Sequence, residues 1–75
     1  MAPELEARKH YSKGFEFAKA SQYENAIAQY TKAIEIDPDD VSAYLDRSTA
    51  FQKLGQLSLA RKDVEKAYKL DRSRR

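Results

Sequence analysis

The segment Lys32-Ala33-Ile34-Glu35-Ile36-Asp37-Pro38 has a pattern that returns 34 residues later as Lys66-Ala67-Tyr68-Lys69-Leu70-Asp71. The same shift aligns further identical pairs: Phe17 with Phe51, Lys19 with Lys53, Gln22 with Gln56, and Ala26 with Ala60. Ordinary residue usage would give roughly two or three identities in such a window by chance. A fixed period of this length is typical of a solenoid, in which each repeat is one supersecondary unit stacked on the next.

Four amphipathic stretches, each with apolar residues at helical spacing, fill the chain. We expect helices over residues 3–20, 21–36, 41–54 and 57–70. Ser21 and Glu24 have the spacing of a capping box at the start of the second helix. Pro38 ends that helix because proline cannot continue it, and Gly55 offers the left-handed conformation that a short turn requires. Strand patterns are absent, so the sequence predicts an all-α chain of two antiparallel helix-turn-helix units.

The bulk composition limits the possible functions. A chain of 75 residues is long enough for one small domain, over residues 1–75. Its 14 basic and 12 acidic residues give a net charge of +2, which is too balanced for a dedicated nucleic-acid binder. The chain has no cysteine, no apolar signal at its acidic start and no stretch long enough to cross a bilayer. We therefore expect an intracellular protein, cytoplasmic or nuclear, that does not enter membranes.

Residue patterns for catalysis or for cofactor binding are missing. An enzyme needs an activated nucleophile, a paired acid and base, a metal cluster or a phosphate-binding loop, and the sequence contains none of these motifs. His10 is the only histidine, and it is expected to pack at a helical interface. Asp37, Asp39 and Asp40 lack the glycine and the terminal glutamate of a calcium loop, so helix termination and capping explain them. We expect no enzymatic activity, no metal and no cofactor.

The sizes of the side chains within the period resemble those of the tetratricopeptide repeat family, whose unit is two antiparallel helices, A and B, in 34 residues. The units are residues 7–40 and 41–74, and residues 1–6 extend the first helix. Gly14 and Ala26 take the small positions at the helix crossing, and Ser48 and Ala60 repeat them. Inward apolar residues expected on the helices are Tyr23, Ile27, Tyr30, Ala33, Ile34, Tyr44, Phe51, Leu57, Val64 and Ala67, with Tyr68 as a further candidate. The resemblance implies a short right-handed α-solenoid.

The resemblance also implies a function, because in this family the A helices line a concave groove that binds peptides. Carried over by position, the groove residues are Arg8, Tyr11, Phe15, Ala18, Lys19, Ser42, Leu45, Thr49, Gln52 and Lys53. Tyr11 and Phe15 are expected as apolar anchors. Arg8, Lys19 and Lys53 are expected to contact an acidic partner. The implied function is a non-catalytic adaptor or scaffold that binds a peptide with apolar and acidic character. Alternatively, Tyr11, Phe15 and Leu45 pack together as core and bind nothing.

Two other functions stay open at this point. Arg72 stands where the second repeat should have proline, which suggests a fragment of a longer protein, or a chain that dimerises. Leu59, Tyr68 and Leu70 are candidates for an uncovered surface that mediates self-association. The third reading is binding of an acidic chaperone tail, as in related adaptors that use a carboxylate clamp. We disfavour it because the clamp positions hold Tyr11, Phe15 and Asp46, and Asp46 would repel a carboxylate.

Overall fold

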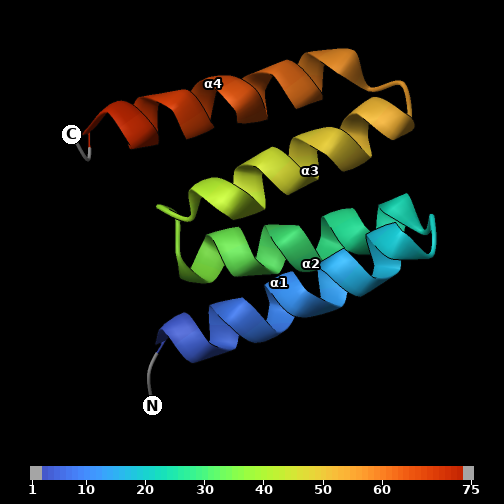
Figure 1. The fold of residues 1–75 in the computed structure, drawn as a ribbon, viewed down its shortest axis with the longest axis horizontal. Coiled ribbons are helices and arrows are strands. Elements are labelled where there is room, and N and C mark those ends of the chain that lie inside the picture. The colour runs from blue at the N-terminus through green and yellow to red at the C-terminus, as the bar shows by residue number, and fades with distance from the viewer. Residues whose placement is uncertain (1–2, 74–75) are drawn as a thin grey trace.

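The computed structural model describes residues 3–73 as a purely helical chain. The helices are α1 (Pro3–Lys19), α2 (Tyr23–Ile36), α3 (Val41–Lys53) and α4 (Leu57–Ser73). They form two hairpins that lie side by side, α1 with α2 and α3 with α4 (Figure 1). The hairpins are joined through α2, which packs against α3. The expected all-α pair of helix-turn-helix repeats is confirmed, and none of the helices in the described residues is long and apolar enough to span a membrane.

Small side chains fill the crossings between neighbouring helices. Ala26 and Ala33 on α2 and Ala67 on α4 are completely buried, and Tyr30 is the largest side chain with almost no exposed surface. Gly14 of α1 lies against Tyr30, so closely that a Cβ placed on Gly14 would come within 2.7 Å of the tyrosine ring. Helices 8–10 Å apart are about as close as side chains allow, so one partner at the crossing must be small. The expectation that Gly14 and Ala26 are the small residues at this crossing is therefore confirmed.

The turns inside the two hairpins have the same geometry, one repeat apart. Ser21 and Gly55 both adopt left-handed backbone conformations, with φ of 60° and 78°. In each turn the following amide donates to a carbonyl five residues earlier, as from Gln22 to Phe17 at 2.8 Å. This is the Schellman arrangement that closes a helix at a left-handed residue. The role expected for Gly55 is confirmed.

The expected capping box at Ser21 and Glu24 is wrong. The N-cap of α2 is Gln22, and no side chain caps the first amides of this helix. Ser21 instead supplies the left-handed residue that ends α1. The turn is too short for one residue to close the first helix and also to cap the second, because the two roles need different backbone conformations.

Replacing Ser21 with glycine should stabilise the fold. A residue with a Cβ is strained at positive φ, and relief of that strain exceeds the entropy that glycine adds to the unfolded chain. We expect a gain of about 0.5 kcal/mol, seen as a rise in Tm of about 2–4 °C by circular dichroism. Gly55→Ser is the reciprocal control: a Cβ there meets nothing within 4 Å, so the loss expected for this variant reports backbone strain alone. A lower Tm for Ser21→Gly would contradict this account.

The outer side of α4 differs from expectation at Leu57 and Tyr68. Leu57, expected in the core, is 63% exposed, so that prediction is wrong. Leu57 is the first residue of α4 and follows directly on the turn after α3. The helix that α4 packs against is α3. Tyr68, the further inward candidate, is exposed as well, Leu59 is exposed, and Leu70 is only partly buried. An uncovered apolar surface on α4 was expected. Helical spacing places Leu57 with Tyr68 and Leu59 with Leu70 on opposite sides of α4, so these residues do not form one continuous surface.

Candidate peptide-binding groove

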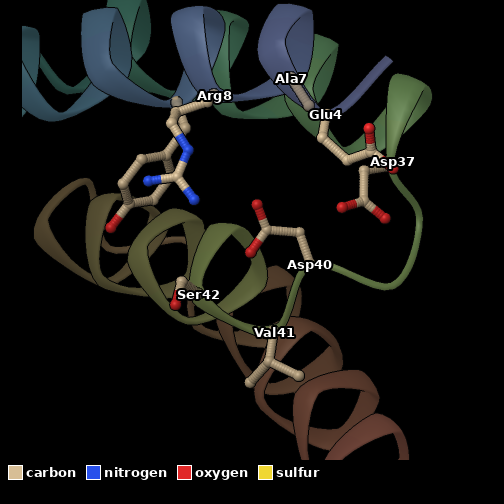
Figure 2. Close-up of a pocket in the computed structure, with 8 residues that line it drawn as sticks. Glu4, Ala7, Arg8, Asp37, Asp40, Val41 and Ser42 are labelled. Carbon is tan, nitrogen blue, oxygen red and sulfur yellow. The ribbon is translucent and has the colours of Figure 1, made fainter. Parts of the chain in front are cut away.

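The candidate site lies between the two A helices, α1 and α3. The helices run in the same direction in Figure 1, and α1 contacts α3 directly. A pocket of about 320 Å³ opens between their N-terminal halves. Its lining consists of Glu4, Ala7, Arg8 and Tyr11 from α1, Asp37 and Asp40 from the loop after α2, and Val41 and Ser42 from α3 (Figure 2). The loop reaches this pocket because α2 returns antiparallel to the start of α1.

Tyr11 connects the two helices across the groove. Its hydroxyl donates to Asp46 Oδ2 at 2.5 Å, and its ring packs on Tyr30 with centroids 5.7 Å apart. Burial, and then the hydrogen bond to the carboxylate of Asp46, raise the pKa of Tyr11 well above its usual value. Burial and the charge of Asp46 likewise raise the pKa of Tyr30 to about 12. Both phenols are therefore neutral at physiological pH, and Tyr11 contributes to the packing of α1 against the rest of the fold.

Phe15 of α1 and Leu45 of α3 are apolar groove residues that stay open to solvent, and Leu5, at the start of α1, is a further exposed apolar side chain. Phe15 is 47% exposed and Leu45 is 38% exposed. The ammonium of Lys19 lies 5.7 Å from the centre of the Phe15 ring, and it also lies 3.9 Å from a carboxylate oxygen of Glu16. The alternative expectation was that Tyr11, Phe15 and Leu45 pack together as core. Tyr11 is partly buried, whereas Phe15 and Leu45 are exposed.

The structure divides the residues that the sequence places in the groove. The pocket gathers Arg8, Tyr11 and Ser42. The others lie outside its lining: Phe15, Ala18, Lys19, Leu45, Thr49, Gln52 and Lys53. Thr49 donates its hydroxyl to the Leu45 carbonyl at 3.2 Å, so it is already engaged on its own helix. Gln52, Lys53 and Lys19 are exposed at the C-terminal ends of the two helices.

The carboxylates of the pocket are the feature that sequence reasoning missed. Figure 2 shows Glu4, Asp37 and Asp40 around the pocket that also receives Arg8. Asp40 caps α3, since its Oδ1 accepts from the amide of Ala43 at 3.2 Å. From the sequence, Asp37 and Asp40 are expected only to end and to cap helices. The predicted hairpin could have indicated this pocket. The end of an antiparallel B helix lies next to the start of its A helix, so the acidic residues after α2 come close to Glu4. Among the described residues, no cluster of three metal-ligating side chains is arranged to hold a metal ion.

A buried ion pair behind the groove was also missed. Arg47 of α3 forms two hydrogen bonds to Asp63 of α4, at 2.8 and 2.7 Å, and a third to Thr31 of α2 at 3.2 Å. The guanidinium also lies over the rings of Tyr44 and Phe51. The hydrogen bond to Asp63, opposed in part by burial, raises the pKa of Arg47 above its usual value. Arg47 therefore ties three helices together.

The fold and the groove define a helical-hairpin repeat protein, and comparison with known proteins specifies the family. A family model described as TPR repeat matches residues 14–55, and one described as tetratricopeptide repeat matches residues 41–74. The chain belongs to the tetratricopeptide repeat family, and it is a protein-interaction module. The resemblance inferred from the 34-residue period is thereby confirmed.

Several curated proteins are similar to the chain. Hsp70-Hsp90 organizing protein 3 of Arabidopsis thaliana is 40% identical over 67 residues, which cover 89% of this chain and 12% of that protein. Hsp70-Hsp90 organizing protein 2 of the same plant is 36% identical over 77 residues, covering 91% of this chain and 14% of that protein. Protein unc-45 homolog B of Danio rerio is 46% identical over 50 residues, which cover 67% of this chain and 5% of that protein. The chain thus spans less than one sixth of the length of these relatives.

Proposed function

We propose that the chain is an adaptor module that binds an extended peptide segment of another protein along the groove between α1 and α3. The observation that carries the proposal is the exposure of Phe15 and Leu45, one on each A helix. Exposed apolar side chains framed by polar residues are typical of interaction sites. Lys19, Gln52 and Lys53, at the ends of the same helices, supply the polar frame on one side.

An exposed phenylalanine is a good anchor for a ligand. The ring has few torsions to order on binding, and its burial removes a large apolar area from water. Lys19 lies over the Phe15 ring and covers part of it. Because Lys19 and Glu16 are both exposed, a ligand can displace this weak pair at little cost. The same lysine can then contact an acidic group of the bound peptide.

Binding of an acidic chaperone tail is less well supported than binding of a peptide with an apolar centre. The names of the relatives refer to Hsp70 and Hsp90, so the possibility is a natural one. The residues at the clamp positions of this chain are nevertheless of the wrong kind. The Tyr11 hydroxyl is occupied by Asp46, and the Phe15 ring offers no donor. A terminal carboxylate brought to this place would meet the negative charge of Asp46.

Replacing Phe15 with alanine should weaken peptide binding about tenfold and change stability little, because truncation of an anchor costs binding energy while a half-exposed ring contributes little to the core. The probe is a fluorescently labelled peptide of two leucines followed by two glutamates. Fluorescence anisotropy measures the Kd, and thermal circular dichroism measures the Tm. Leu59→Ala, on the outer side of α4, is the matched control, and it should leave the Kd unchanged.

The same pair of variants tests self-association, the second candidate, which the exposed Leu57, Leu59 and Tyr68 favour. Sedimentation of the unlabelled chain gives its mass as a function of concentration. A mass that rises with concentration, and falls in Leu59→Ala but not in Phe15→Ala, would assign the α4 surface to assembly. If Phe15→Ala mainly unfolds the chain, the ring belongs to the core and the groove proposal fails.

A further inference from the structure

The groove changes its charge from one end to the other. At the N-terminal end of the A helices lie the carboxylates of Glu4, Asp37 and Asp40, and Arg8 lines the same pocket from one side (Figure 2). Among the described residues, none of these three carboxylates forms an ion pair; the pairs found are Lys9 with Glu6, Lys19 with Glu16, and Arg47 with Asp63. At the C-terminal end, Lys19 and Lys53 are the charged residues predicted to face a ligand. The two ends therefore favour ligand charges of opposite sign.

The negative end stays negative after its positive groups are counted. The N-terminal poles of α1 and α3 each contribute about half a positive charge, and Arg8 contributes one. Three carboxylates outweigh these by about one unit of charge. Asp46, which is hydrogen-bonded to Tyr11 in the pocket lining, adds a fourth carboxylate next to them. A cation entering the pocket would be attracted, and an anion would be repelled.

We propose that the groove binds a peptide of mixed charge, an inference that rests on the proposed function. A lysine or arginine side chain of the peptide enters the pocket of Glu4, Asp37 and Asp40. Its apolar side chains lie over Phe15 and Leu45, and its acidic residues lie toward Lys19 and Lys53. This adds a basic side chain to the apolar and acidic peptide expected from the sequence. Arg8, expected from the sequence to contact an acidic partner, lines the same pocket as the three carboxylates, which lower its attraction for an anion.

The length of the groove sets the length of the ligand. Glu4 and Lys19 are 15 residues apart on one helix, which corresponds to about 22 Å at the helical rise. An extended peptide covers about 3.3 Å per residue, so about seven residues separate its basic end from its acidic end. The pocket, of about 320 Å³, has room for one long side chain. An eight-residue peptide is therefore the appropriate probe.

The test uses labelled peptides with two central leucines and two glutamates at one end. The other end carries lysine, glutamine or glutamate, and each peptide is made in both chain directions, acetylated and amidated so that side chains alone carry charge. Of the two chain directions, the one that binds wild type more tightly is used for the comparison. In that direction we expect the lysine peptide to bind about tenfold more tightly than the glutamate peptide, with the glutamine peptide between them. The preference should shrink as salt is added, since these carboxylates lie near solvent.

The variant Glu4→Gln, Asp37→Asn, Asp40→Asn removes the charges but keeps the shapes, and asparagine remains a good N-cap for α3. It should bind the three peptides equally. The control, Glu24→Gln, Glu35→Gln, Glu65→Gln, removes the same number of charges from exposed positions on α2 and α4 and should keep the preference.

Each outcome is decisive for one of the two proposals. If wild type binds all three peptides equally and Phe15→Ala weakens each of them, the groove stands and its charge polarity is overturned. The polarity is also overturned if both triple variants behave alike. If no peptide binds to folded wild type, the groove itself fails, and the polarity fails with it.

Discussion

Replacing Asp63 with alanine should destabilise the chain by about 3 kcal/mol, the largest effect that we expect from a single substitution. The change leaves the guanidinium of Arg47 without its carboxylate, in a place where the side chain is only 18% exposed. Partial rotation toward water relieves some of the cost, so the lower end of the range for broken buried pairs applies. A domain of this size has about 4–11 kcal/mol of stability in total, so the variant should lose between about a quarter and three quarters of it.

Urea unfolding followed by circular dichroism measures this loss. Glu65→Ala, two residues further along α4 and exposed, is the matched control and should change stability by less than about 0.5 kcal/mol. The double variant Arg47→Met with Asp63→Leu tests the reason for the loss. An apolar pair of similar volume should restore most of the stability, because the penalty of Asp63→Ala comes from an unpaired buried charge. Equal stability of Asp63→Ala and Glu65→Ala would show that the ion pair does not hold the helices together.

Replacing Gly14 with alanine should destabilise the chain by about 1–2 kcal/mol, although alanine is the better helix former. The new Cβ would lie 2.7 Å from two atoms of the Tyr30 ring and 3.2 Å from the Ala26 carbonyl oxygen. Tyr30 is buried and cannot swing away, so α1 must move off α2. That displacement also strains the hydrogen bond between Tyr11 and Asp46.

A double-mutant cycle with Tyr30→Leu identifies the clash as the cause. Gly14→Ala should be harmless or stabilising when leucine replaces the ring, which gives a coupling energy of about 1 kcal/mol or more. Ser12→Ala, at an exposed position of α1, is the control for helix propensity and should not destabilise. If Gly14→Ala costs the same in both backgrounds, the ring of Tyr30 is not what requires glycine at this position.

The sequence predicts which helices carry the groove residues, but not which contacts those residues make. The 34-residue period and the spacing of apolar residues placed Phe15 and Leu45 on the A helices, and both are exposed there. The same reasoning counted Tyr11 as a second anchor, whereas the structure engages its hydroxyl with Asp46 and its ring with Tyr30. Helical periodicity identifies the side of a helix on which a residue lies, but not which polar group from another helix meets it there.

The repeat, the four helices and the small residues at their crossings follow from the sequence, because they depend on the spacing and size of side chains along the chain. Which polar groups meet depends on how the helices pack. Tyr11 and Asp46 are 35 positions apart, and Arg47 and Asp63 are 16 apart. The acidic pocket likewise combines the start of α1 with the loop after α2. Such contacts depend on the rotation and offset of packed helices, which small differences in side-chain volume at the crossings control.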